Sequence, residues 1–377
     1  MTEDKICISG KCTGCWACVN ICPKSCISMQ TGKLGHLYPQ INQSKCVNCK
    51  LCQKICPENN EPKLISPIAA YASWHQKPNE YLSSTSGGAA TAFAEKIIEL
   101  GGIVYGCESK TGLDISHSKV CSLNDIHRLK GSKYVQSNIN NTYCQIKADL
   151  DNNIKVLFIG TPCQCAALKS FLRKEYENLY CVDLICHGVP SLKLLRSHVQ
   201  KITSEEGVSV AFRKGNDMGL RVFDKDNRQI YYSNVWYSRY KDIYYNAFID
   251  GLTYRDSCYS CRYARPERGT DVTIGDFWGL GDDLKHDNIN GCSCVLPNTE
   301  KGLRLVLESN LENNQRTVDE AVNGNSQLRH PTKKSFKIKI FRVLNWCLPL
   351  KMAYYISELP DIIKVRFIVP IKNRLRK

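Results

Sequence analysis

Apolar runs alternate with amphipathic segments through the middle of the chain. Residues 101–107, 153–160 and 178–186 form short, almost continuous apolar runs, which are typical of strands buried on both faces. Residues 90–100 instead space their apolar side chains as a helix does, and the run stops at Gly101, a common helix terminator. This alternation predicts an α/β domain with a largely buried sheet.

The pattern changes on both sides of that region. Residues 208–215 and 228–237 have the character of strands in a mixed or antiparallel arrangement. Upstream, the polar, proline-containing stretch 57–67 indicates a domain boundary near residue 62. The predicted division is a small domain at 1–62, a linker and first strand at 63–80, a large domain at 81–330 and a tail at 331–377.

One cysteine spacing, C-x2-C-x2-C-x3-C-P, occurs twice in the small domain, at residues 12–23 and again at 46–57. Three closely spaced cysteines can bind three irons of one cubane, and the fourth, ahead of proline, reaches the cubane of the other half. The duplication therefore predicts two 4Fe–4S clusters. Their expected ligands are Cys12, Cys15, Cys18 and Cys56 for one, and Cys46, Cys49, Cys52 and Cys22 for the other.

A pair of zinc sites is the alternative, since C-x2-C knuckles also bind zinc. Zinc would not require the fourth cysteine and the proline in both halves, so clusters explain the spacing better. The segment resembles bacterial two-cluster ferredoxins, which store and pass single electrons. Cys7 and Cys26 fall outside the pattern and are expected to be bystanders.

Cysteine content and hydropathy bear on the compartment. The 377 residues include 22 cysteines, and neither a secretory signal nor a long uninterrupted apolar span is recognisable. We therefore expect a cytoplasmic protein. Disulfides are rare there, so metal ligation is the expected use of many of the thiols.

The formal net charge of +15 is concentrated in the tail, where residues 331–377 hold 12 Lys or Arg against Glu358 and Asp361. The rest of the chain carries an ordinary charge, so nucleic acid is not an expected partner. A basic stretch mixed with apolar residues can contact an anionic membrane surface, dock on a partner, or fold over the large domain.

Two loops could hold an anionic cofactor. Residues 83–93 place hydroxyls and two glycines ahead of a predicted helix, where free N–H groups and the helix dipole favour phosphate. Residues 129–137 combine glycine, serine, lysine and tyrosine. Taken alone, the first loop is more typical of a helix cap, and the second of an exposed turn.

A family resemblance connects these loops with later cysteines. The motifs STSGGAATAFAE, LKGSKYVQS, VLFIGTPCQ, VDLICHGVPS, CYSCRYA and DVTIGDFWG follow one another between residues 84 and 279. In this order they resemble the coenzyme F420 hydrogenase/dehydrogenase beta-subunit family, over roughly residues 1–310 once the ferredoxin-like module is included. The resemblance implies a flavin-containing oxidoreductase domain with its own 4Fe–4S cluster near the flavin, which would be FAD or FMN.

The resemblance assigns two sets of residues, one to a third cluster and one to the flavin. The third cluster would be bound by Cys163, Cys186, Cys258 and Cys261. The flavin would be contacted by Ser86, Gly87, Gly88, Gly131, Ser132, Lys133 and Tyr134.

The residues themselves are compatible with this third cluster. Cys163 and Cys186 each follow a predicted strand, where ligand sites gather in open α/β sheets, and the pair at 258 and 261 needs distant partners. The alternative is a nucleophilic Cys163 at a helix start, with His187 as a base. Cys165, Cys292 and Cys294 stay unassigned, as do any catalytic residues.

The sequence thus predicts a multidomain α+β and α/β protein, a small two-cluster ferredoxin fold followed by a larger mixed α/β flavin- and cluster-binding domain. The expected function is an iron–sulfur flavoprotein oxidoreductase that passes electrons between 4Fe–4S clusters and a flavin. The flavin would reduce or oxidise an organic substrate, a coenzyme F420-like deazaflavin or another acceptor. A redox partner protein or a small molecule would exchange the electrons. An electron-transfer relay subunit with no substrate site of its own is the alternative.

Overall fold

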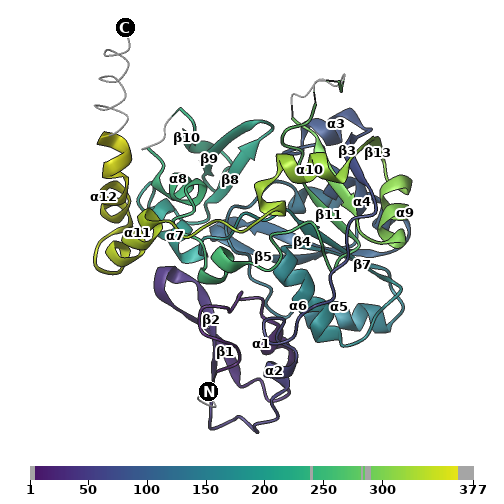
Figure 1. Ribbon diagram of the computed structural model, residues 1–377, viewed down its shortest axis with the longest axis horizontal. Coiled ribbons are helices and arrows are strands. Elements are labelled where there is room, and N and C mark those ends of the chain that lie inside the picture. The colour runs from purple at the N-terminus through teal and green to yellow at the C-terminus, as the bar shows by residue number, and fades with distance from the viewer. Residues whose placement is uncertain (1–4, 238–240, 282, 285–289, 364–377) are drawn as a thin grey trace.

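The computed structural model describes residues 5–237, 241–281, 283–284 and 290–363 (Figure 1). The N-terminal part of the chain forms a small lobe, purple in Figure 1, built on an antiparallel hairpin of two strands. Its elements are α1 (Ala17–Ile21), β1 (Ile27–Thr31), β2 (Leu37–Ile41) and α2 (Leu51–Lys54). Trp16 and Lys50, at matching positions of the two cysteine motifs, both adopt left-handed backbone conformations, with φ of 67° and 58°. The sequence duplication is therefore also a structural one.

A mixed eight-stranded sheet forms the centre of the large lobe. Its order is β13 (Leu311–Arg316), β3 (Ala70–His75), β12 (Ser293–Pro297), β11 (Val272–Asp276), β7 (Leu179–Leu184), β6 (Val156–Gly160), β4 (Ile103–Lys110) and β5 (Asp114–Val120). The four strands from β11 to β4 run parallel, and the flanking pairs are antiparallel. The predicted mixed α/β fold is confirmed, as are the strands expected at 101–107, 153–160 and 178–186.

Helices cover both faces of this sheet, which explains the continuous apolar runs. On β6, Leu157 packs with α4 (Ala89–Glu99) and α9 (Glu300–Glu308), whereas Phe158 faces α5 (Thr142–Asp151) and α6 (Pro162–Leu172). Burial of successive residues on opposite faces removes the polar alternation of a half-exposed strand. The shorter helices α3 (Pro78–Leu82) and α10 (Val318–Gly324) lie near the β3–β13 end of the sheet (Figure 1).

The small lobe is packed against the α5–α6 face. Cys15, Ala17 and Ile55 belong to the same hydrophobic core as Tyr143 and Phe171 of those two helices. In addition, the Ser170 hydroxyl donates to the backbone oxygen of Ile55 over 2.6 Å. The boundary predicted near residue 62 stays a prediction, but the two lobes share one core.

A separate antiparallel sheet follows in the order β10 (Gln229–Asn234), β9 (Asp217–Phe223) and β8 (Ser209–Lys214). It confirms the antiparallel arrangement expected for this part of the chain. Its inner face packs with the helices α7 (Leu192–Val199) and α8 (Ile243–Ile249).

The described part of the basic tail is a helical hairpin, α11 (Phe336–Cys347) and α12 (Leu350–Ile363). Phe341 and Tyr354 are fully buried against Ala247 of α8, so the hairpin is part of the fold. Residues 364–377 of the predicted tail lie outside the described residues. Within the described chain, no helix combines the length and the apolar character needed to cross a bilayer.

Candidate functional site

The structure brings together the thiols of Cys12, Cys15, Cys18 and Cys56, the first group. Burial raises the pKa of the Cys18 thiol well above its ordinary value, and the other three thiols raise it further. Three of these cysteines come from the first motif and Cys56 from the second, so thiols of both halves lie together here; their role as ligands stays a prediction.

The thiols of Cys22, Cys46, Cys49 and Cys52 form the second group. Burial raises the pKa of Cys52, and the nearby Cys22 and Cys49 add to the rise. Cys46 reaches the same place, since it and Cys22 both interact with the thiol of Cys26. Cys49 is exposed, whereas Cys15, Cys18 and Cys56 of the first group are buried. The second group therefore lies nearer the surface.

The third group contains Cys163, Cys186, Cys258 and Cys261, which come from three separate segments. Cys163 lies in the first turn of α6, after the N-cap Thr161, and Cys186 follows β7. The other two belong to a 3₁₀ turn at Asp256–Ser260 and to the residue that ends it. Burial raises the pKa of Cys163 well above its ordinary value, and Cys186, Cys261 and Cys258 raise it further.

The donor chemistry of the three groups suits iron–sulfur clusters. Each contains four free cysteines, which are the soft ligands that such clusters take. Among the described residues, no three His, Cys, Asp or Glu side chains converge closely enough to hold a single metal ion. A cubane offers a separate iron to each thiolate and so tolerates thiols that are spaced more widely.

The surroundings of Cys163 do not resemble those of an activated nucleophile. Such a thiol needs a lowered pKa and partial exposure. The pKa of Cys163 is raised, and its Sγ atom lies 3.2 Å from the Thr161 hydroxyl. Burial lowers the pKa of His187, the base considered from sequence, which makes it a weaker acceptor for a thiol proton.

Several side chains connect the first and third groups. Nη1 of Arg255 donates to the backbone oxygen of Cys12 over 3.2 Å, and the backbone oxygen of Arg255 accepts from the N–H of Cys258 over 3.0 Å. Burial raises the pKa of Tyr263, and both Cys163 and Cys15 also act on it. The first group is thus the one that lies next to the third.

The two loops expected to hold a flavin lie side by side. The hydroxyls of Thr85 and Ser132 are 3.2 Å apart, and Lys130 donates to the Ser83 hydroxyl over 2.6 Å and pairs with Glu80. The Ser86 hydroxyl donates to the backbone oxygen of Cys292 over 3.0 Å.

The glycines of these loops have different constraints. A Cβ atom on Gly87 would lie 2.0 Å from the backbone oxygen of Ser73, so only glycine fits there. Gly88 has φ of +88° and starts α4, while Gly131 has φ of +87° with no atom within 4 Å of its would-be Cβ.

Lys133 and Tyr134 direct their side chains into the protein. Nζ of Lys133 donates to the backbone oxygens of Leu129 and Lys130, each over 2.7 Å. The Tyr134 ring stacks on Phe248 with centroids 4.9 Å apart. The space beside the loop is therefore approached by the backbone and by Ser132 more than by these two side chains.

An ion pair that the sequence did not reveal lies beside the second loop. Nη1 of Arg213 is 2.6 Å from the Asp276 carboxylate, and Arg213 also interacts with Tyr134. Asp276 in turn acts on His187, next to Cys186. The pair joins β8 to β11, and nothing in either local sequence marks it.

Five cysteines outside the assigned sets are now placed. Cys7 interacts with Cys12 and Cys56, and Cys26 Sγ lies 3.3 Å from Cys22, so these expected bystanders border the first and second groups. Cys165 is fully buried and donates to the backbone oxygen of Val182 over 3.6 Å. Cys292 and Cys294 belong to the core around β3 and β12.

Comparison with known proteins agrees with this organisation. Residues 154–322 match the family described as the C terminus of the coenzyme F420 hydrogenase/dehydrogenase beta subunit, and residues 11–60 match the 4Fe–4S dicluster domain. All four cysteines of the third group fall inside the first match. The resemblance stated from the sequence motifs is confirmed.

A similar solved structure comes from the F420-reducing NiFe hydrogenase complex of Methanosarcina barkeri. Its chain is 17% identical, the match covers 70% of this chain and 91% of that chain, and the TM-score is 0.48. Comparison with curated protein sequences gave no match.

Proposed function

We propose that this chain, an iron–sulfur electron-transfer oxidoreductase, carries three 4Fe–4S clusters and a flavin. The proposal is supported by the match of residues 11–60 to a 4Fe–4S dicluster domain and of residues 154–322 to the F420 hydrogenase/dehydrogenase beta-subunit family. The three groups of four thiols would be the ligands. One observation carries the proposal: Cys163, Cys186, Cys258 and Cys261, distant in sequence, gather beside the first group.

The order of the groups supports a linear relay. The second group is nearest the surface, the first is buried between the lobes, and Arg255 joins the first to the third. From the third group, His187, Asp276 and Arg213 lead to the loop at Tyr134. Bound clusters would supply one-electron steps and a bound flavin the change to two-electron chemistry.

The loops at residues 83–88 and 129–134 would hold the flavin, FAD or FMN. Gly87 keeps the first loop free of side-chain bulk at its contact with Ser73, and the start of α4 provides the positive end of a helix dipole for a phosphate. The two-electron substrate would be a deazaflavin of the coenzyme F420 type or another organic donor or acceptor.

Iron, sulfide and flavin quantification after anaerobic purification tests this function. We expect about twelve irons and one flavin per chain, from three four-iron clusters. About eight irons with no flavin would contradict it and favour the relay alternative. Cys163→Ala should lose about four irons, whereas the control Cys165→Ala, which removes a neighbouring thiol outside the group, should keep them all.

The family is named for a subunit, so we propose that the chain exchanges electrons with a partner protein in the cytoplasm.

We also propose that the helical hairpin α11–α12 contacts a membrane surface. Its buried side faces α8, and its opposite side exposes the apolar side chains of Phe336, Val343, Trp346, Met352, Ile356 and Leu359. Lys339 and Lys351 are exposed among them, a combination that suits an anionic lipid surface.

Vesicle cosedimentation tests the membrane contact. Wild-type protein should sediment with phosphatidylglycerol-containing vesicles, and Trp346→Ser and Phe336→Ser should weaken this binding. Trp236→Ser removes a comparably exposed tryptophan elsewhere and should not. Deletion of residues 331–377 is unsuitable, since it would uncover the core at Ala247.

A further inference from the structure

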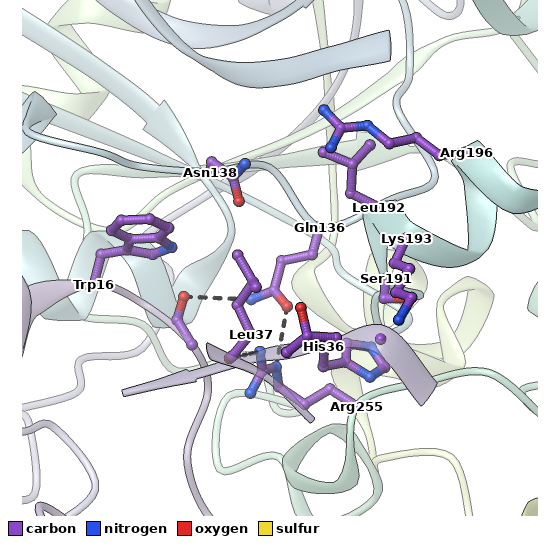
Figure 2. Close-up of a pocket in the computed structure, with 13 residues that line it drawn as sticks. Trp16, His36, Leu37, Gln136, Asn138, Ser191, Leu192, Lys193, Arg196 and Arg255 are labelled. Carbon is purple, nitrogen blue, oxygen red and sulfur yellow. Dashed lines mark hydrogen bonds between the residues drawn. The ribbon is translucent and has the colours of Figure 1, made fainter. Parts of the chain in front are cut away.

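A cavity of about 210 Å³ lies between the small lobe and the large one (Figure 2). The small lobe contributes Gly14 and Trp16 from the first cysteine motif and His36 and Leu37 from the hairpin. The large lobe contributes Gln136 and Asn138, the start of α7, and Arg255. The cavity is distinct from the two loops expected to hold the flavin.

The cavity wall carries positive charge without a compensating carboxylate. Lys193, Arg196 and Arg255 line it, and no Asp or Glu is among its described lining residues. In the part of the chain that the structure describes, none of the three cations is in an ion pair. The carboxylate next in sequence, Asp256, is already paired with Lys334 at 2.9 Å and Arg342 at 2.7 Å.

Arg255 is a fixed part of this wall, with only 1% of its surface exposed. Its Nε donates to Gln136 over 3.0 Å, and its Nη2 donates to the backbone oxygen of Leu37 over 2.5 Å. These acceptors are neutral, as is the backbone oxygen of Cys12 that accepts from Nη1, so the guanidinium is oriented without a carboxylate partner. The guanidinium also packs over the Tyr38 ring at 4.5 Å.

The remaining polar groups also suit an anion. Arg196 uses Nε and Nη2 to bind the backbone oxygen of Leu113, which leaves Nη1 available. His36 adds no charge of its own, because burial and then Arg255 lower its pKa to about 3. The first turn of α7, capped by Ser191, adds a partial positive charge.

We propose that this cavity binds a small oxyanion, as a free carboxylate or phosphate or as the anionic end of a larger molecule. Cations that lack a carboxylate partner beside a cavity favour a ligand that can accept charge-assisted hydrogen bonds. The volume is below the roughly 300–1,000 Å³ of pockets for drug-sized ligands, which restricts the part that enters to a few atoms. Lys193 and Arg196 are the residues to test, because Arg255 also contacts the first group.

Calorimetric titration of anaerobically purified protein tests the site. Inorganic phosphate and succinate are titrated separately, with chloride holding the ionic strength constant. We expect saturable binding of one anion per chain for at least one of the two. Lys193→Met and Arg196→Met should each weaken it about tenfold, the usual scale for a lost hydrogen bond to a charged group.

Lys201→Met is the matched control, since this exposed lysine follows the same helix and does not line the cavity. Anion binding by Lys201→Met should equal that of the wild type. Binding of phosphate alone would identify a phosphate group as the ligand chemistry, and binding of succinate alone a carboxylate. Absence of saturable binding would overturn the proposal, as would equal weakening by all three substitutions or weakening by none.

Discussion

Arg255 Nη1 lies 3.2 Å from the backbone oxygen of Cys12, and this hydrogen bond ties a buried cation of the large lobe to the first cysteine motif. The guanidinium also lowers the pKa of the Cys12 thiol, an effect second to the hydrogen bond from Cys7 among those that lower it. A positive charge at this position stabilises added negative charge on anything bound by the first group.

Replacing Arg255 should therefore change the redox properties of the first group. In Arg255→Met, the midpoint potential of the cluster bound there should become more negative, since reduction adds an electron next to a lost cation. Arg255→Lys should restore part of the difference. Redox titration monitored by electron paramagnetic resonance measures both, and an unchanged potential in Arg255→Met would show that the contact is only structural.

His36 should make the stability depend on pH. Its Nε2 lies 2.9 Å from the Val189 carbonyl oxygen, so it donates as a neutral ring, and burial lowers its pKa to about 3. The unfolded chain, with a histidine pKa near 6.5, then binds the extra proton, and stability falls as the pH drops below that value. Between pH 8 and 5.5 this group should cost about 1.4 kcal/mol.

Urea unfolding of wild type and His36→Gln at the two pH values isolates this contribution. The free energy of unfolding of the wild type should fall by more than that of the variant. Equal falls in the two proteins would rule out His36 as the source.

Two glycines of the expected flavin loops should respond differently to alanine. A Cβ on Gly87 would meet the backbone oxygen of Ser73 at 2.0 Å and the backbone nitrogen of Ser293 at 2.5 Å. Gly87→Ala should therefore lose about 1–3 kcal/mol or more of stability, together with bound flavin. Gly131→Ala meets open space and should cost only about 1–2 kcal/mol for the left-handed backbone. Thermal unfolding and flavin absorbance measure the two effects, and equal losses would contradict the assigned crowding.

Cys22 and Cys26 test the ligand assignment where two thiols compete. Their Sγ atoms are 3.3 Å apart, yet only Cys22 belongs to the duplicated motif. Cys26→Ala should keep all the iron, whereas Cys22→Ala together with Cys26→Ala should lose about four irons per chain. Iron analysis decides between them; loss of iron in Cys26→Ala alone would make Cys26 the ligand.

Much of the fold could be predicted from the sequence because strands buried on both faces of a sheet appear as continuous apolar runs. The strands β4, β6 and β7 were predicted from apolar runs, and α4 from helical spacing ended by Gly101. The tail is harder to interpret: its basic composition leaves open a membrane surface, a partner or packing on the large domain, whereas in the structure Phe341 and Tyr354 hold α11 and α12 in the core.

Only part of the candidate site can likewise be predicted from the sequence. Cysteine spacing predicts the first two groups because their ligands are close in sequence and duplicated. The third group needed the family resemblance, since its ligands come from three segments. Arg255 and the Arg213–Asp276 pair gave no signal, because a buried arginine is recognised only through partners that tertiary structure supplies.

The core shared by Cys15, Ala17 and Ile55 with α5 and α6 bears on whether the small lobe can move. Separating the two lobes would expose this apolar surface to water, so the fold favours a fixed position of the small lobe on the large one. We therefore expect the small lobe to stay docked during electron transfer, rather than to swing between partners as a tethered carrier would.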